Sequence, residues 1–169
     1  TVRLRDLTKG TETQTLRGHA QVVTDLAFGP RGDFLFSSSW DTAVRVWPVR
    51  ARGGALLEGH QIGVHAVDFA PDGRRLVSGG HDDALRVWDL AAGEDRVLSG
   101  HEDNVYRVRY SPDGRWIASS SDDRTVRLWP AGGGAPRVLR GHRGDVEELA
   151  FSADGRWLGT RCHEGSCRP

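Results

Sequence analysis

The strongest constraint on this chain is an internal repeat with a step of 41 residues. A Gly-His dipeptide returns four times at this step, as Gly18-His19, Gly59-His60, Gly100-His101 and Gly141-His142. Three tryptophans keep the same step, as Trp47, Trp88 and Trp129. A period of this length is typical of repeat proteins, in which each unit buries its apolar face against the next. The 169 residues are therefore four copies of one unit rather than one ordinary domain.

The pattern inside each period predicts β-strands. Apolar and polar side chains alternate in short runs rich in β-branched and aromatic residues. One period holds four such runs, for example 96–98, 105–110, 116–119 and 126–129. Turns that contain Gly, Asp and Pro separate the runs, and no segment shows a sustained helical stripe. We expect an all-β fold over the single segment 1–169, with units at about 18–58, 59–99 and 100–140, a partial unit at 1–17 and a truncated one at 141–169.

Charge and cysteine content restrict the classes of function. The chain has 23 basic and 23 acidic residues, so no bulk field favours a nucleic acid or an anionic membrane. It has no apolar run of roughly 18 residues and no signal-peptide pattern. Two cysteines near the end cannot form a disulfide framework. We expect a cytoplasmic protein that binds neither membrane nor nucleic acid. Because it starts at Thr1 and lacks Met, we also expect it to be a piece of a longer product.

The Gly-His dipeptide, the step of 41 residues and the run Val87-Trp88-Asp89 resemble the WD-repeat β-propeller family. Two units depart from its pattern, because Pro48 and Pro130 follow the tryptophan in place of Asp. The resemblance covers essentially the whole chain and implies about four blades of four antiparallel strands. Three arrangements stay open: a small ring closed by a strand near 13–16, a larger ring of two chains, or an open arc of a longer propeller. We favour the arc, whose unpaired edges predict self-association.

The resemblance also implies a structural role for residues that resemble a catalytic triad. One His, one Ser, one Asp and one Trp of each unit are expected to form a buried hydrogen-bonded chain. These residues are His19, Ser37, Asp41 and Trp47, then His60, Ser78, Asp82 and Trp88, then His101, Ser119, Asp123 and Trp129. A catalytic set is built once, not in every unit, and the nucleophile sequence Gly-x-Ser-x-Gly is absent from the sequence. We therefore predict no enzymatic activity, no catalytic residue and no cofactor.

The family resemblance places three positions of each unit on the face that carries the Gly-His loops. They are the fourth and sixth residues after the Gly and the residue before the network Asp. The positions are Val22, Thr24 and Trp40, then Gly63, His65 and His81, then Asn104, Tyr106 and Asp122, then Asp145, Glu147 and His163. The units differ at these positions although they agree at the network positions, which indicates partner contacts. A solvated polar rim is the alternative.

Nine of these residues are our candidate contacts for a protein or peptide partner: Thr24, Trp40, His65, His81, Asn104, Tyr106, Asp122, Asp145 and Glu147. Large aromatic side chains are over-represented among interface hot spots, so Trp40 and Tyr106 are the expected anchors. The acidic residues among the nine favour a basic segment of the partner.

Two hypotheses about function remain open. The first is a non-enzymatic scaffold that binds a protein or peptide on the loop face. The second is a regulatory or sensory segment of a larger signalling enzyme, such as the propeller-bearing bacterial protein kinases, whose catalytic domain lies elsewhere. A Gly-rich phosphate loop or a His-Arg-Asp catalytic loop would mark such an enzyme, and neither occurs in these residues.

Two further patterns carry little functional information. Arginines recur two places before the tryptophan position, as Arg3, Arg45, Arg86, Arg127 and Arg168, and alternation predicts that they face solvent. At the end of the chain, Cys162 and Cys167 lack the four ligands of a structural zinc site, so we expect no metal. We expect free thiols there, with a local disulfide between the two as the alternative. Thr160 and Glu164 replace the network Ser and Asp there. This last unit should therefore be the least stable.

Overall fold

The computed structural model describes residues 1–8, 10–51 and 53–163. In these residues the regular structure consists of β-strands alone. None of them belongs to a helix with the length and apolarity needed to cross a bilayer. The strands form separate sheets that follow one another along the chain, as expected when each 41-residue unit folds locally and then packs against its neighbours.

Three of the sheets contain four antiparallel strands each. The first is β3 (Val23–Phe28), β4 (Phe34–Ser39), β5 (Val44–Pro48) and β6 (Ala55–Leu57). The second is β7 (Val64–Phe69), β8 (Arg75–Gly80), β9 (Ala84–Asp89) and β10 (Glu94–Ser99). The third is β11 (Val105–Tyr110), β12 (Trp116–Ser121), β13 (Val126–Pro130) and β14 (Arg137–Leu139). The predicted all-β fold of four-stranded antiparallel blades is thus confirmed.

One grouping of the predicted runs is wrong. Residues 96–98 lie in β10, which pairs with β9 of the second sheet and not with the strands that follow it. A repeat counted from that run therefore spans two sheets. The physical reason is the tight turn after β9, which brings β10 back beside β9 before the chain crosses to the next sheet.

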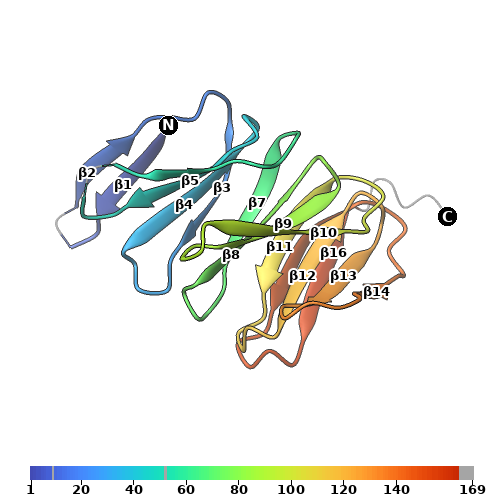
Figure 1. Cartoon of the computed structure of the whole chain (residues 1–169). Helices are drawn as coiled ribbons and strands as arrows, with labels where there is room; N and C mark the ends of the chain where they lie inside the picture. The colour runs from blue at the N-terminus through green and yellow to red at the C-terminus, as the bar shows by residue number, and fades with distance from the viewer. Residues whose placement is uncertain (9, 52, 164–169) are drawn as a thin grey trace.

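The sheets at the two ends have two strands each within the described residues. They are β1 (Val2–Asp6) with β2 (Thr11–Leu16), and β15 (Val146–Phe151) with β16 (Leu158–Cys162). Figure 1 shows β1 and β2 at one end of an open arc and β14 and β16 toward the other. The β1–β2 pair and the β15–β16 pair are separate sheets, so among the described residues the small ring closed by residues 13–16 is not formed.

The open end is visible in the burial of equivalent side chains. Leu26 of β3 is 48% exposed, whereas its counterparts in the next two sheets, Val67 and Val108, are almost fully buried. The later residues are covered because β7 packs against β3 and β11 packs against β7. No first strand of a preceding sheet covers β3 in the described chain, so Leu26 and Phe28 stay exposed. Self-association stays a prediction, which a molar-mass measurement would test.

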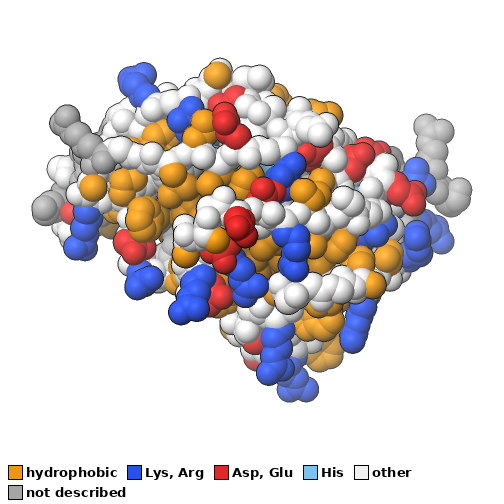
Figure 2. All heavy atoms as spheres, viewed as in Figure 1, with side chains coloured by type: hydrophobic (Ala, Val, Ile, Leu, Met, Phe, Trp, Pro, Cys, Tyr) orange, Lys and Arg blue, Asp and Glu red, His pale blue; other side chains and the backbone are white. Residues whose placement is uncertain are grey.

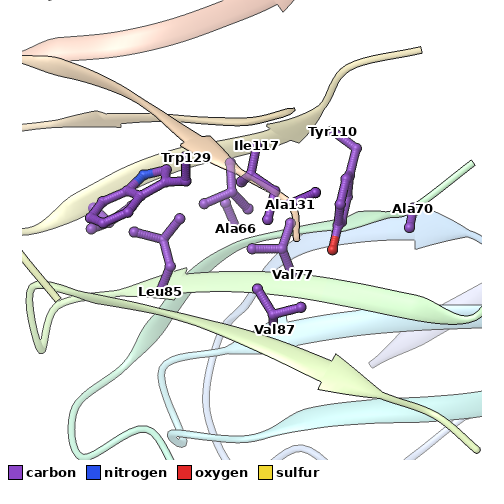
Figure 3. Close-up of a cluster of buried hydrophobic side chains, with 11 residues drawn as sticks. Ala66, Ala70, Val77, Leu85, Val87, Tyr110, Ile117, Trp129 and Ala131 are labelled. Atoms are coloured by element: carbon purple, nitrogen blue, oxygen red, sulfur yellow. The ribbon is translucent and has the colours of Figure 1, made fainter. Parts of the chain in front are cut away.

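The hydrophobic core lies in the layers between successive sheets. One cluster joins the second and third sheets and is drawn in Figure 3, where Leu85 and Val87 of β9 face Ile117 of β12 and Trp129 of β13. Two smaller clusters fill the preceding layers between sheets. The outer surface is mixed: Figure 2 shows scattered charges of both signs and a band of apolar side chains over β4 and β5. Each sheet is therefore stabilised mainly by its neighbours.

Candidate functional site

The histidine of each Gly-His dipeptide begins a chain of buried hydrogen bonds. In the second sheet, Trp88 Nε1 donates to Ser78 Oγ at 2.8 Å, and Ser78 Oγ lies 2.8 Å from His60 Nε2. His60 Nδ1 lies 2.9 Å from the carboxylate of Asp82. Because a carboxylate only accepts, His60 must donate from Nδ1 and accept the Ser78 hydroxyl proton at Nε2. Every polar atom along this chain has one defined role.

The same chain is present in the neighbouring sheets. The separations from His to Ser are 2.7 Å for His19–Ser37 and for His101–Ser119. The separations from His to Asp are 2.9 Å for His19–Asp41 and 2.7 Å for His101–Asp123. Trp47 and Trp129 donate to the serine oxygens at 2.8 Å. In the last sheet His142 Nε2 lies 2.8 Å from Thr160 Oγ1, and Glu164 lies outside the described residues.

These sets are not arranged for nucleophilic catalysis. The three serines are fully buried, and each hydroxyl oxygen already accepts a tryptophan N–H. Burial would raise the pKa of Asp123, but hydrogen bonds from Thr125 and His101 lower it to about 2. Burial also lowers the pKa of His101. A permanently charged carboxylate holding a neutral imidazole suits a structural link between a loop and two strands.

The glycines of the first three Gly-His dipeptides, Gly18, Gly59 and Gly100, each make room for an arginine that was expected to face solvent. A Cβ atom at Gly59 would lie 2.7 Å from Arg86 Nη1. The Arg86 guanidinium lies 5.9 Å from the Trp88 ring centroid and also pairs with Asp95, so only 16% of the side chain is exposed. Arg45 and Arg127 lie over their tryptophans in the same way. The solvent-facing expectation is therefore wrong for these three arginines, because the missing glycine side chain opens a slot over the indole.

The three loop-face positions of each unit are brought together by the backbone. In every unit the residue before the network Asp position donates its N–H to the carbonyl of the fourth residue after the Gly, at 2.9–3.1 Å. The sixth residue after the Gly is the extra residue of a β-bulge. The bulged residues are Thr24, His65, Tyr106 and Glu147. A bulge frees its residue from the ladder and re-aims the side chain, which explains why this position reaches the loop face.

Four of the candidate residues form one cluster across three sheets, which we call the aromatic–histidine cluster: Trp40, His65, His81 and Tyr106. The His65 ring centroid lies 4.3 Å from that of His81, 4.9 Å from that of Tyr106 and 6.4 Å from that of Trp40. Gly63 lies beneath Trp40, since a Cβ there would be 3.0 Å from Trp40 Cα. Trp40 is 44% exposed, so it offers an apolar face beside polar ring atoms.

Carboxylates gather beside this cluster and form what we call the acidic sector: Asp103, Asp122, Asp145 and Glu147. Burial raises the pKa of Tyr106, and all four carboxylates add to the shift. Burial also raises the pKa of Asp122, with further contributions from Asp145 and Asp103. Asn104 donates to one Asp122 oxygen at 3.0 Å, while the other oxygen is buried without a hydrogen-bond partner. This unpaired oxygen is suited to a cationic donor.

The structure modifies two members of the candidate set. Thr24 is half-buried, and its hydroxyl donates to the Val64 carbonyl of the next sheet at 2.6 Å, so it joins two sheets. Glu147 is partly neutralised by Arg161, at 3.0 Å. Asp103 of the acidic sector was missed because it lies three residues after Gly100, outside the positions taken from the resemblance. Its position in an exposed loop with other acidic residues was the available signal.

No group of three or more His, Cys, Asp or Glu side chains able to hold a metal ion occurs within 1–8, 10–51 and 53–163. Cys162 is half-buried at the end of β16. Cys167 lies outside the described residues.

The half-buried position of His65 predicts a pH-dependent stability. Burial, together with His81 and Arg107, lowers the pKa of His65 from 6.5 to about 4. Between these values the unfolded chain binds a proton that the folded chain does not, so the free energy of unfolding falls as the pH is lowered through this window. We expect this fall to be smaller by about 1 kcal/mol in His65→Phe, allowing for the half-exposed ring. Urea denaturation on both sides of the window measures it, and equal slopes for the two proteins would contradict the assignment.

Comparison with known proteins agrees with this architecture. The family model described as "WD domain, G-beta repeat" matches residues 10–48, 54–89, 94–130 and 134–168. One relative is the Periodic tryptophan protein 2 homolog of Schizosaccharomyces pombe, 44% identical over 41 residues, which is 24% of this chain and 5% of that protein. Another is the Mitotic checkpoint protein bub-3 of Caenorhabditis elegans, 35% identical over 57 residues, which is 34% of this chain and 16% of that protein. The matched segment is thus a small part of each relative.

The four family matches cover most of the chain and begin near the last strand of one sheet, so each extends into the next sheet. This is the same offset that the pairing of β10 with β9 showed. The repeat, the open arc of four-stranded sheets and the family matches agree: the chain belongs to the WD40-repeat family.

Proposed function

We propose that this chain binds a protein or peptide segment carrying a basic residue on its loop face. WD40 repeats generally act as scaffolds for protein–protein interaction and are typically not enzymes. The observation that carries the proposal is the aromatic–histidine cluster, which spans three sheets and adjoins the acidic sector. The aromatic–histidine cluster fits an apolar side chain of the peptide, and the acidic sector fits an adjacent Arg or Lys side chain.

The charge of this face supports a protein partner over the other classes. A nucleic acid or an anionic membrane would bring phosphates toward Asp122, Asp145 and Asp103. Burial, together with repulsion from the other two carboxylates, already raises the pKa of Asp122. Binding of a basic peptide would relieve that repulsion and supply a donor for the unpaired Asp122 oxygen. We also propose a cytoplasmic location, for which the scarcity of cysteine, two in 169 residues, is the support.

We expect Trp40→Ala to weaken peptide capture without unfolding the chain. A random peptide library displayed on phage and selected on the wild-type protein should yield peptides that contain Arg or Lys. Their affinity should drop at least about tenfold in Trp40→Ala and in Asp122→Asn, because each removes an anchor of the site. Fluorescence titration measures the Kd, and circular dichroism checks the fold.

The matched control is Trp157→Ala, which removes an equally large and 72% exposed ring near the opposite ends of the strands. Its peptide affinity should equal that of the wild type. Selected peptides without basic residues, or an unchanged affinity in folded Trp40→Ala, would refute the proposal.

A further inference from the structure

Neighbouring sheets are joined at the end opposite to the Gly-His loops by a recurring hydrogen bond. A side chain of the last strand of one sheet donates to a backbone carbonyl in the turn after the third strand of the next sheet. Gln14 Nε2 donates to the Val49 carbonyl at 3.2 Å, and Arg96 Nη2 donates to the Ala131 carbonyl at 3.0 Å. Both pairs are 35 residues apart. Arg75 donates to the same Ala131 carbonyl at 3.3 Å.

The junction between the first and second four-stranded sheets has lost these donors. At the same step along the sequence, the donor position is Ala55 and the acceptor is the carbonyl of Leu90. The counterpart of Arg75 is Phe34. Neither Ala55 nor Phe34 has a side-chain donor, so the polar closure seen at the next junction cannot form here.

A cavity of about 390 Å³ occupies this place, and Phe34, Ala55 and Leu90 are among the residues that line it. Phe36 and Phe69 meet edge to face in its wall, with ring centroids 4.9 Å apart. The band of apolar side chains over β4 and β5 in Figure 2 marks this region of the surface. The volume lies within the range of about 300–1,000 Å³ that is typical of small-molecule sites.

The corresponding hollow at the next junction differs in size and chemistry. It has about 240 Å³, and most of its lining residues are charged. These charged residues are Arg75, Asp89, Glu94, Asp95 and Arg96. Ala55 and Phe34 stand where the next junction has Arg96 and Arg75. The cavity between the first and second four-stranded sheets is therefore larger and more apolar than the hollow at the next junction.

The rim of the apolar cavity carries an excess of negative charge. Its charged lining residues are three carboxylates, Asp33, Asp89 and Glu94, and one guanidinium, Arg31. Backbone N–H groups of Ala92 and Ala91 hold the pKa of Asp89 below its usual value, so this carboxyl stays ionised at neutral pH. Carboxylates and a backbone carbonyl favour a ligand that donates from a cationic nitrogen.

We propose that this cavity binds a small organic cation with an aromatic or branched alkyl body. The body lies against the phenylalanine rings of the cavity wall, and an ammonium or guanidinium group donates to the carbonyl of Leu90. The next junction contains the same chemistry within the chain, because Arg96 brings an alkyl stem and a guanidinium to the Ala131 carbonyl. The site is independent of the loop face, because turns after the first and third strands lie at the other end of an antiparallel sheet.

The test uses 2-phenylethylamine, with 2-phenylethanol and 3-phenylpropionate as the neutral and anionic comparisons. Nuclear magnetic resonance follows the indole N–H signal of Trp88, which lines the cavity, against those of Trp47 and Trp129 as internal references. The amine should shift the Trp88 signal with a Kd of about 1 mM, as expected for a fragment of its size. The alcohol and the carboxylate should bind about tenfold more weakly, because they lack the cationic donor.

Ala55→Arg restores the side chain found at the Arg96 position and should abolish binding of the amine while the protein stays folded. Leu56→Arg is the matched control: it adds the same group one residue later on β6, outside the cavity lining, and should bind as the wild type does. If Ala55→Arg does not fold, Ala55→Gln, which copies Gln14, takes its place. Three results would overturn the proposal. They are no binding of 2-phenylethylamine by the wild-type protein, equal affinity of the wild type for 3-phenylpropionate, and wild-type affinity for the amine in the folded Ala55 variant.

Discussion

Replacing Asp82 by alanine is expected to lower the Tm of this chain by about 10 °C. The carboxylate accepts from His60 Nδ1 at 2.9 Å and from the backbone N–H of Gln61 at 3.0 Å, and its side chain is only 11% exposed. Removing it leaves the fully buried His60 side chain without an acceptor, which costs about 3 kcal/mol or more. For a chain of this length each kcal/mol corresponds to about 2–4 °C.

Thermal unfolding followed by circular dichroism measures the effect. Asp82→Asn keeps one acceptor oxygen and should fall between the wild type and Asp82→Ala. Glu58→Ala removes an exposed carboxylate and should change the Tm by less than about 2 °C. If Asp82→Ala has the same Tm as the wild type, the hydrogen-bonded chain does not stabilise this sheet.

The second large effect is expected for Trp129→Ala. Trp129 is 2% exposed, belongs to the core cluster between the second and third sheets (Figure 3), and donates from Nε1 to Ser119. The substitution leaves a cavity in that layer and removes the donor to a buried hydroxyl. We expect a loss of about 3–5 kcal/mol in the free energy of unfolding.

Urea denaturation of Trp129→Ala gives this free energy directly. Trp157→Ala serves as the comparison, because it deletes the same side chain where it is 72% exposed, and it should cost less than about 0.5 kcal/mol. Trp129→Phe should be intermediate, since it keeps part of the ring volume but not the N–H. Equal losses for the two alanine variants would show that the layer between the sheets is not the main core.

The sequence alone was sufficient for most of the fold because the constraint is periodic. The step from Gly18 to Gly59 to Gly100 fixes which segments are equivalent, and alternation fixes the strands within them. Pairing between strands is a different kind of information. The run at 96–98 was grouped with the strands after it, whereas the turn following β9 places it with those before it.

The candidate site was predictable in part. The family resemblance supplied the positions of His65, His81 and Tyr106, but their contacts depend on distances between different sheets, which no single period encodes. The alternation of apolar and polar residues wrongly predicted that Arg86 faces solvent, because the space beside Trp88 is created by Gly59 from another segment. The hydrogen bond of Thr24 was not predictable for a related reason, since its acceptor, the Val64 carbonyl, belongs to the neighbouring sheet.

The cavity near Ala55 could not be predicted from the repeat pattern alone. Ala55 is unremarkable in a sequence with many small residues, and only the hydrogen bonds of Gln14 and Arg96 reveal that a donor is missing there. A residue that differs from its equivalents in the other units can be interpreted structurally only when the contact made by those equivalents is known.

The β-bulge of each unit has a consequence for how this surface could change over time. The bulged residue is not held opposite a partner in the ladder, so its side chain can be exchanged without shifting the register of the sheet. Thr, His, Tyr and Glu occupy the four equivalent places within one common backbone. The backbone is therefore the same in the four units, whereas the side chain at the bulged position differs from unit to unit. We expect substitutions at residues 65, 106 and 147 to change binding specificity without altering the fold, whereas the side chain at residue 24 also joins two sheets through its hydrogen bond to the Val64 carbonyl.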